Sequence, residues 1–195
     1  MARYKGPILK RCRTLDLDPT YLGIDKESNR QSKRTNKKLS EYGRQLREKQ
    51  KAKFVYGVLE KPFKNYFVKA QKMKGMTGTN LMVLLESRID NVVFRLGYAR
   101  TRREARQLVL HNHFTVNGKK VNIPSYSLKV GDVIAIKEAS ASSELFKTIL
   151  DVSSTRVTPA WIEKNENSAK IGRLPEREEI DTPVDESLIV ELYSK

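Results

Sequence analysis

The stretch from Gly97 to Val121, GYARTRREARQLVLHNHFTVNGKKV, decides the fold of the central part of the chain. Its first half predicts a helix, because Thr101 can cap the helix start and Glu104 three residues later completes the pattern of a capping box. The apolar residues of this helix are expected to share one face: Ala105, Leu108 and Val109. The arginines are expected on the opposite side, so that their joint replacement would leave the fold intact: Arg102, Arg103 and Arg106.

The second half of the stretch predicts a β-hairpin, with strands His113–Val116 and Lys119–Asn122 joined by Asn117-Gly118. This dipeptide tolerates the two positive φ angles of a type I′ turn. The hairpin would place Asn117, Lys119 and Lys120 beside the arginine-led helix as one concave set of donors. Such a set suits the phosphates and 2′-hydroxyls of structured RNA. The alternative is that these groups are ordinary solvated charges.

The distribution of charge along the chain indicates the kind of partner. The 195 residues are 38% hydrophobic and 31% charged, so the chain can bury a core and still leave long solvated parts. Residues 1–80 hold 21 Lys and Arg against 7 Asp and Glu, residues 81–137 hold 10 against 4, and residues 138–195 hold 7 against 12. This basic N-terminal two-thirds, within a net charge of +15, predicts a polyanionic partner. The longest apolar run, Leu81–Leu85, is too short to span a membrane, so no membrane partner is expected.

No pattern in the sequence points to catalysis or to a metal. The single cysteine, Cys12, cannot form an internal disulfide and fits a reducing cytosol. Together with the only histidines, His111 and His113, it does not supply the four ligands of a structural zinc site. The carboxylates cluster near the C-terminus without a pocket signature. We therefore predict no enzyme activity, no cofactor and no metal.

Residues 1–39 are expected to form an irregular basic arm, which is either a solvated tail or a segment that folds against phosphate. A helix is expected over Ser40–Lys53, with Tyr42 and Leu46 as its apolar pair. Its cationic face comprises Arg44, Arg47 and Lys51. A second helix after Pro62 carries a stripe assigned to the core: Phe63, Tyr66, Phe67, Ala70 and Met73.

The pattern then predicts a loop over 74–80 and a helix over Leu81–Leu96, with a possible break near Ser87 and a stop at Gly97. A strand is expected over Val133–Lys137. Branched residues predict further β-structure over 146–152 and 156–162. A short amphipathic helix is expected at the end, from Leu188, Ile189, Leu192 and Tyr193.

The stretch Ser87–Ile134 resembles the small RNA-binding module named after the fourth protein of the small ribosomal subunit. The resemblance rests on Arg88-Ile89-Asp90, the arginine-led helix, the V-N-G-K turn and the K-V-G-D that follows. The flanks MARYKGPILKRCR, KKLSEYGRQLREKQKAKFVYGVLEKPFKNYF, GTNLMVLLESRIDNVVFRLGYA and LPEREEIDTPVDESLIVELYSK resemble the bacterial or organellar ribosomal protein family that gave the module its name. The resemblance therefore covers essentially the whole chain.

The resemblance implies an α+β fold with a helical N-terminal domain and an α/β domain that holds the RNA-binding module of two helices and a β-hairpin. The implied division is a basic arm over 1–39, a helical domain over 40–86 joined by the C-terminal segment 176–195, and an RNA-binding domain over 87–175, with the module at about 87–150. Many relatives carry four zinc-binding cysteines in the arm, whereas Cys12 alone is present here, so the chain resembles the zinc-free form.

The implied function is a structural component of the small ribosomal subunit in the cytoplasm. It would bind 16S ribosomal RNA first, at a junction in the 5′ domain, and nucleate assembly of the subunit body. Implied partners are neighbouring proteins, notably the fifth of the small subunit, and mRNA where it enters the subunit; translational accuracy would be affected through these contacts. The alternatives are an RNA-binding regulator and an RNA-modifying enzyme of the pseudouridine synthase type that uses the same module.

The RNA-binding residues expected from the module are Arg88, Arg100, Thr101, Arg102, Arg103, Arg106, Gln107, His113, Asn117, Lys119 and Lys120. Those expected from the arm and the first helices are Arg3, Lys5, Arg11, Arg13, Lys33, Arg34, Lys37, Lys38, Arg44, Arg47, Lys51 and Lys53.

Overall fold

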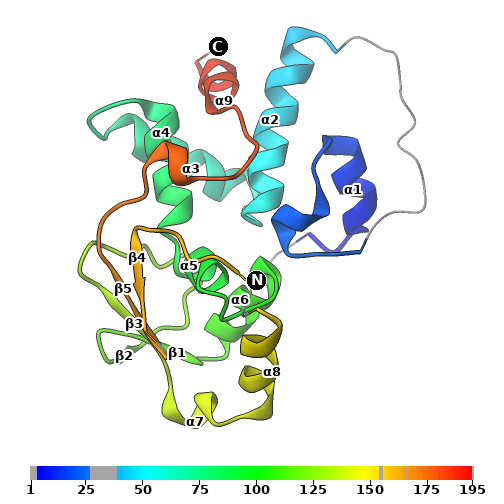
Figure 1. The fold of residues 1–195 in the computed structure, drawn as a ribbon. Helices are drawn as coiled ribbons and strands as arrows, with labels where there is room; N and C mark the ends of the chain where they lie inside the picture. Colours follow the sequence, from blue (N-terminus) through cyan, green and yellow to red (C-terminus); the bar gives the residue numbers. More distant parts are fainter. Residues whose placement is uncertain (1–3, 27–38, 154–155, 166, 195) are drawn as a thin grey trace. The chain divides into compact units, whose positions relative to one another are not determined.

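A computed structural model describes residues 4–26, 39–153, 156–165 and 167–194. The chain divides into two compact units, one formed by Met1–Met82 with Asp181–Lys195 and the other by Val83–Ile180 (Figure 1). The first is helical and the second combines helices with a small antiparallel sheet, so the predicted α+β fold class is confirmed. Among the described residues, no helix is long and apolar enough to cross a membrane.

The first unit is built from helices. In chain order they are α1 (Ile8–Leu15), the 3-10 helix η1 (Pro19–Leu22), α2 (Glu41–Val55), α3 (Glu60–Gln71), the first part of α4 (Thr77–Glu86) and α9 (Glu186–Tyr193). Ser40 caps α2 by accepting a hydrogen bond from the Gly43 N–H.

The C-terminal helix α9 packs along α2, although the two elements lie far apart in the sequence. The Tyr193 ring of α9 packs against Phe67 with centroids 4.6 Å apart, and its hydroxyl donates to Glu60. The Tyr56 and Thr182 hydroxyls are hydrogen-bonded at 3.1 Å and buried. The C-terminal segment thus contributes part of the core of this unit.

Three predictions for the first unit were wrong. Residues 1–39 are not irregular throughout, because α1 buries Cys12 and Leu15 at an i, i+3 spacing. Tyr42 is 59% exposed, and α2 buries Gln45, Ala52 and Val55 instead. The predicted loop over 74–80 ends at Met76, since α4 begins at Thr77.

The aromatic stripe of α3 is only partly core. Phe63, Phe67 and Ala70 are buried as predicted, whereas Tyr66 is half-buried and Met73 is exposed.

The second unit contains a five-stranded sheet with helices packed against one face (Figure 1). In chain order its elements are α5 (Ile89–Arg95), α6 (Arg102–Leu110), β1 (Phe114–Val116), β2 (Lys119–Lys120), β3 (Val133–Ile136), α7 (Glu138–Ala141), α8 (Glu144–Val152), β4 (Ile162–Lys164), β5 (Ser168–Ile171) and the 3-10 helix η2 (Arg177–Glu179). The strand order is β2-β1-β3-β5-β4, and all neighbours are antiparallel.

Alternation along the strands separates a buried face of the sheet from an open one. Phe114, Val116, Ile134 and Ile136 point into the core, which also holds the buried residues of α5, α6 and α8. The helix expected over Leu81–Leu96 is interrupted near Ser87, a point that the sequence left open, because α4 ends at Glu86 and α5 begins at Ile89. The hairpin is also confirmed, since Asn117 and Gly118 have φ values of 49° and 76°.

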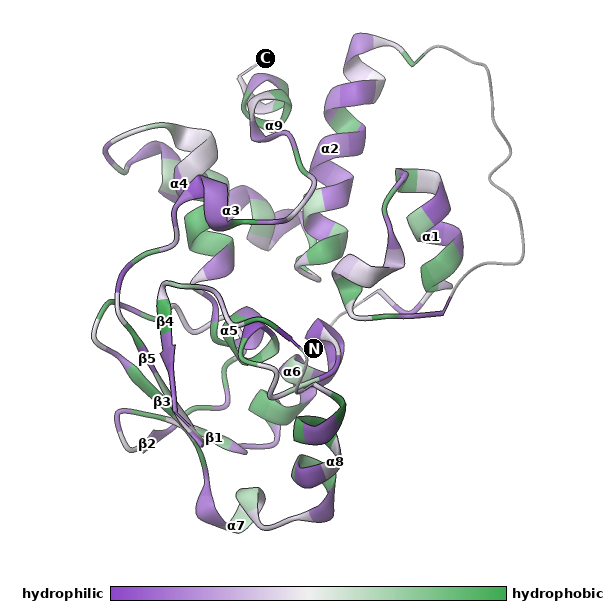
Figure 2. Cartoon of the chain, viewed as in Figure 1, coloured by the Kyte–Doolittle hydropathy of each residue, from purple (hydrophilic) through white to green (hydrophobic). Residues whose placement is uncertain are grey.

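The β-structure predicted over 146–152 was wrong, since this segment is helix α8. Ser143 caps it through the Phe146 N–H, and Phe146 and Ile149 are buried at an i, i+3 spacing. As Figure 2 shows, hydrophobic and hydrophilic residues share α8, which is the pattern of a surface helix. Of the segment 156–162, only Ile162 lies in a strand, and β5 was not predicted.

Candidate nucleic-acid interface

The start of α6 is held by local hydrogen bonds. The Thr101 hydroxyl accepts from the Glu104 N–H at 3.2 Å, as predicted for an N-cap. The Glu104 carboxylate accepts from the N–H of Arg100 at 2.7 Å, one residue before the cap, and from the Arg100 guanidinium at 2.8 Å. Partial burial alone would raise the pKa of Glu104, but the bonds from Arg100 outweigh it and lower that pKa. Arg100 is thereby fixed beside the N-terminus of the helix.

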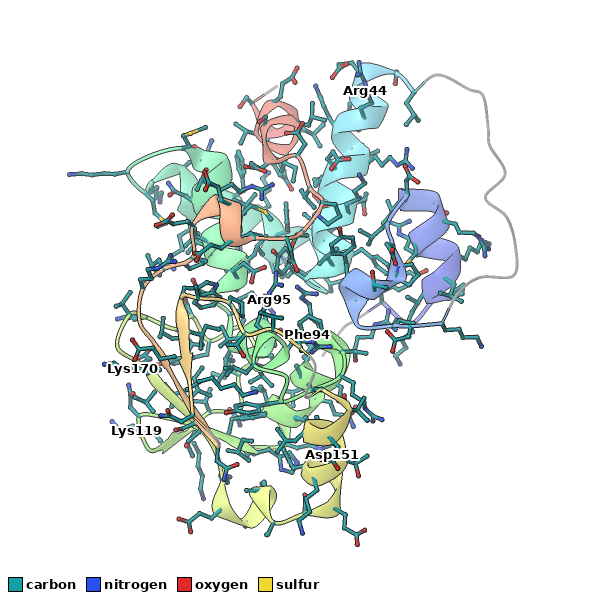
Figure 3. The ribbon with its side chains drawn as sticks, viewed as in Figure 1. Arg44, Phe94, Arg95, Lys119, Asp151 and Lys170 are labelled. Carbon is teal, nitrogen blue, oxygen red and sulfur yellow. The ribbon has the colours of Figure 1, made fainter. Side chains whose placement is uncertain are left out.

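Arg102 points into the protein, which corrects its predicted place on the solvent side. It is 8% exposed, and its Nε donates to the Asn91 side-chain oxygen at 2.7 Å. The Asn91 amide nitrogen in turn donates to the carboxylate of Glu86 at 2.6 Å, and Arg95 contacts the same carboxylate through Nε at 3.1 Å and Nη2 at 2.9 Å. Figure 3 labels Arg95 and the neighbouring Phe94.

This buried network connects α6 to α5 and to the end of α4. Glu86 is 1% exposed, so its charge is balanced by Arg95 rather than by water. Arg102 therefore holds α6 in place, and its side chain is not part of an exposed binding surface.

Asp90 on α5 forms ion pairs with two further arginines of the predicted set. Its carboxylate receives two hydrogen bonds from Arg88, which is 3% exposed, and lies 3.6 Å from the Arg106 guanidinium. The Arg106 side chain is only 19% exposed. Arg103 and Gln107, by contrast, are exposed on the outer side of α6. Of the three arginines expected to face solvent together, only Arg103 does so fully.

The two lysines of the hairpin are exposed, whereas its asparagine forms hydrogen bonds within the protein. Lys119 and Lys120 are exposed on β2. The Asn117 side chain donates to Asp132 at 2.8 Å and accepts from the Val133 N–H at 2.9 Å, so it fastens the turn to β3. His113 is half-buried, with its Nδ1 2.9 Å from the Ser140 hydroxyl. Burial, together with the charges of His111 and Lys137, lowers the pKa of His113.

One exposed lysine of the sheet was not predicted from the sequence. Lys170 is exposed on β5, where it pairs across the sheet with Val133 and Glu163. Figure 3 shows Lys119 and Lys170 projecting from the sheet. The alternation of Ala169, Lys170 and Ile171 between buried and exposed positions is a strand signal that could have found it. Together the exposed cations of the second unit include Arg100, Arg103, Lys119, Lys120 and Lys170, which are exposed on the loop before α6, on α6 and on the sheet.

In the first unit most of the predicted cations have protein partners. Arg44 pairs with Glu41, Arg47 lies 3.8 Å from Asp16, and Lys51 lies 2.7 Å from Glu48. Lys53 and Lys49 contact Glu60 at 2.6 and 2.9 Å. Arg11 donates to the Gln50 side chain at 3.0 Å, and Lys5 is exposed. The predicted Arg3, Lys33, Arg34, Lys37 and Lys38 lie outside the described residues.

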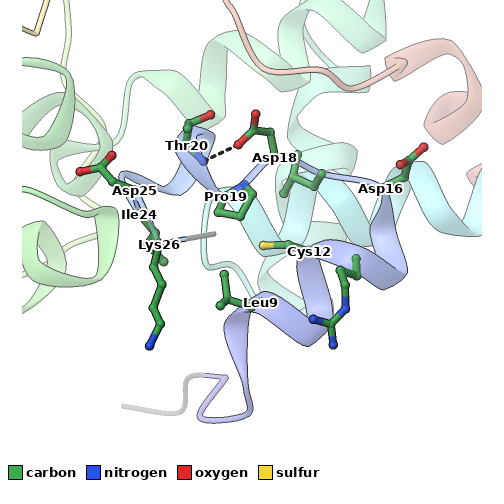
Figure 4. A pocket seen from close by; sticks show the side chains of 11 residues that line it. Leu9, Cys12, Asp16, Asp18, Pro19, Thr20, Ile24, Asp25 and Lys26 are labelled. Carbon is green, nitrogen blue, oxygen red and sulfur yellow. Dashed lines mark hydrogen bonds between the residues drawn. The ribbon is translucent and has the colours of Figure 1, made fainter. Parts of the chain in front are cut away.

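The first unit also contains a cavity of about 520 Å³ between α1, η1 and the segment up to Lys26 (Figure 4). Arg13 and Cys12 line it together with three aspartates, Asp16, Asp18 and Asp25. Asp18 accepts a hydrogen bond from the Thr20 N–H at 2.9 Å, which lowers the pKa of Asp18. Within the described part of the chain, no group of three or more His, Cys, Asp or Glu is arranged to hold a metal ion.

Two family models match the chain. The model of the "Ribosomal protein S4/S9 N-terminal domain" matches residues 3–86, and that of the "S4 domain" matches residues 87–134. Proteins named small ribosomal subunit protein uS4 align with the chain over the whole of both sequences. The protein of Lachnospira eligens is 61% identical over 197 residues, that of Agathobacter rectalis is 61% identical over 197 residues, and that of Heliobacterium modesticaldum is 53% identical over 208 residues.

Proposed function

The chain belongs to the bacterial uS4 family of small ribosomal subunit proteins, and we propose that it is a primary binder of 16S ribosomal RNA in the 5′ domain. It is a structural, non-enzymatic component of the subunit that carries an S4 RNA-binding domain. The observation that supports the proposal most is that the S4 domain, residues 87–134, contains four exposed cations, Arg100, Arg103, Lys119 and Lys120.

The proposed mechanism is electrostatic scaffolding. Arginine and lysine side chains that are fixed on a folded surface can neutralise phosphates and release counterions, which supplies affinity without reading base sequence. The buried bonds of Arg102 and Arg88 keep α5, α6 and the preceding segment rigid, so that Arg100 and Arg103 are held in place before RNA binds. Little conformational entropy then has to be lost on binding.

The more specific parts of the proposal concern the assembled subunit. Binding at a junction of the 5′ domain would nucleate assembly of the subunit body. Contacts with the fifth small-subunit protein and with mRNA where it enters the subunit would influence translational accuracy, and the ribosome would place the chain in the cytoplasm. The end-to-end alignment with ribosomal proteins favours this role over that of a free regulator or an RNA-modifying enzyme.

Co-sedimentation with small subunits tests the proposal. Tagged chain is expressed in cells, small subunits are isolated through a sucrose cushion, and the particles are washed at high salt. We expect the chain to remain at about one copy per subunit, because an integral protein is held by buried contacts as well as by exposed charge. Loss of the chain into the wash, while other integral proteins remain on the particle, would contradict the proposal and indicate a factor that binds the subunit only transiently.

A further inference from the structure

The loop between α5 and α6, residues 96–101, carries the exposed Arg100 and leads into the N-terminus of α6. It begins with a tight turn in which Gly97 has a φ of 76°. A single side chain binds the carbonyls on both sides of this turn. The Arg156 Nη1 donates to the carbonyls of Phe94 at 2.8 Å and Ala99 at 2.9 Å, and its Nη2 donates to the carbonyl of Arg100 at 3.1 Å.

Arg156 also contacts the Phe94 ring, and Arg102, the first residue of α6, contacts the same ring. Its guanidinium carbon lies 4.1 Å from the centroid of the Phe94 ring, and the guanidinium carbon of Arg102 lies 4.3 Å from the same centroid. A cation over an aromatic face is attracted by the ring quadrupole. The two arginines therefore fix the ring between α5 and α6 from two separate parts of the chain.

Ser153, three residues before Arg156, packs on the same turn. A Cβ placed on Gly97 would lie 3.3 Å from the Cβ and the carbonyl oxygen of Ser153, which is tighter than ordinary packing. Ser153 caps the C-terminal end of α8. Ser153 and Arg156 thus both lie close to the loop, although they follow it by more than fifty positions.

We infer that Arg156 is a positioning residue for RNA binding, which holds the loop 96–101 so that Arg100 and Arg103 face the phosphates together. This inference rests on the proposed function and adds a residue outside the matched S4 domain, which ends at residue 134. A planar guanidinium can donate hydrogen bonds to three carbonyls and lie over an aromatic ring at the same time, whereas the ammonium of a lysine is a point charge on a flexible side chain. The role therefore needs the shape of arginine as well as its charge.

The test compares three full-length variants for affinity to a 16S 5′-domain transcript across a range of salt concentrations. R156A removes the contacts and the charge, and R156K keeps the charge but not the geometry. R173A is the matched control, because Arg173 is an exposed arginine of the same unit whose carboxylate partner is Glu179. The thermal melt and the hydrogen exchange of the amides of residues 97–104 are measured on the same samples.

We expect R156A and R156K each to weaken RNA binding at least tenfold, with the slope of log affinity against log salt equal to that of the wild type. Exchange of the 97–104 amides should accelerate in both, while R173A binds within about threefold of the wild type. A slope reduced by about one in R156A, with R156K restoring affinity, would overturn the inference and make Arg156 a direct phosphate contact.

The inference would also be overturned if R156A and R156K bound RNA as tightly as R173A does. Global unfolding of both variants at the assay temperature would overturn it too, since Arg156 would then stabilise the whole core rather than the loop. Failure of the wild type to bind the transcript would instead refute the proposed function. RNA binding by the wild-type chain therefore distinguishes a failure of the proposed function from a failure of the inference about Arg156.

Discussion

Arg102 and Arg103 are adjacent arginines, but Arg102 is buried and Arg103 is exposed. Replacing each by alanine therefore distinguishes an effect on stability from an effect on RNA binding. Arg102 is 8% exposed, donates to Asn91 and lies over the Phe94 ring. A hydrogen bond from a charged donor contributes about 1.5–3 kcal/mol and a partly desolvated cation–π contact about 0.5–2 kcal/mol. Because such contributions are not additive, we expect R102A to lower the free energy of unfolding by about 2–4 kcal/mol.

R103A should behave differently because Arg103 is exposed. Its free energy of unfolding is expected to stay within about 1 kcal/mol of the wild type, as for most surface substitutions. If Arg103 contacts a phosphate, the slope of log affinity against log salt should decrease by about one. We therefore now expect joint replacement of Arg102, Arg103 and Arg106 to lower stability as well as RNA binding, in place of the expectation from the sequence that the fold survives it.

Urea unfolding followed by circular dichroism measures the first quantity, and titration of fluorescent 5′-domain RNA at several salt concentrations measures the second. The reasoning would be refuted if R102A were as stable as the wild type, or if R103A were the more destabilised of the two. Either result would mean that the burial of Arg102 against Asn91 does not hold α6 on α5.

Three further predictions concern other parts of the chain. Replacing Glu86 by alanine should lower the free energy of unfolding by about 3–5 kcal/mol in urea titrations, since it leaves the Arg95 guanidinium buried without its carboxylate; an unchanged midpoint would contradict this. Burial alone would raise the pKa of Glu60, but bonds from two lysines of α2 outweigh it and lower that pKa from 4.5 to about 2. The stabilisation is therefore present above pH 4.5 and is lost as pH falls towards 2, so E60Q should flatten the acid side of the stability profile, and an unaltered profile would argue against it. Joint replacement of Lys119 and Lys120 by alanine should weaken RNA binding and reduce the salt slope by about one to two while the melting temperature stays constant; full affinity would remove the hairpin from the interface.

The sequence allowed the architecture of the second unit to be predicted where local signals agreed with the fold. Thr101, the Asn117-Gly118 turn and Gly97 each determine the backbone locally, and their elements are present as expected. The helix over Glu144–Val152 was mistaken for a strand because Ile149 and Val152 are β-branched, although Phe146 and Ile149 have helical spacing. The strand β5 is only four residues long, so the alternation of Ala169, Lys170 and Ile171 is a short signal, and it was missed.

The orientation of the arginines was harder to predict than the helix that carries them. Arg102 precedes Ala105 by three residues and Val109 by seven, which places it on the apolar face rather than opposite to it. Its partners, Asn91 and Phe94, come from another helix, and a pattern within α6 does not reveal them. The same holds for Arg156, because its contacts join residues more than fifty positions apart.

The salt dependence of affinity for the 16S 5′-domain RNA tests the electrostatic account most directly. If the chain neutralises about six to ten phosphates, its affinity should fall about 10³- to 10⁵-fold between 50 and 200 mM salt. An affinity that stays constant over this range, or the absence of binding at 50 mM salt, would contradict the account.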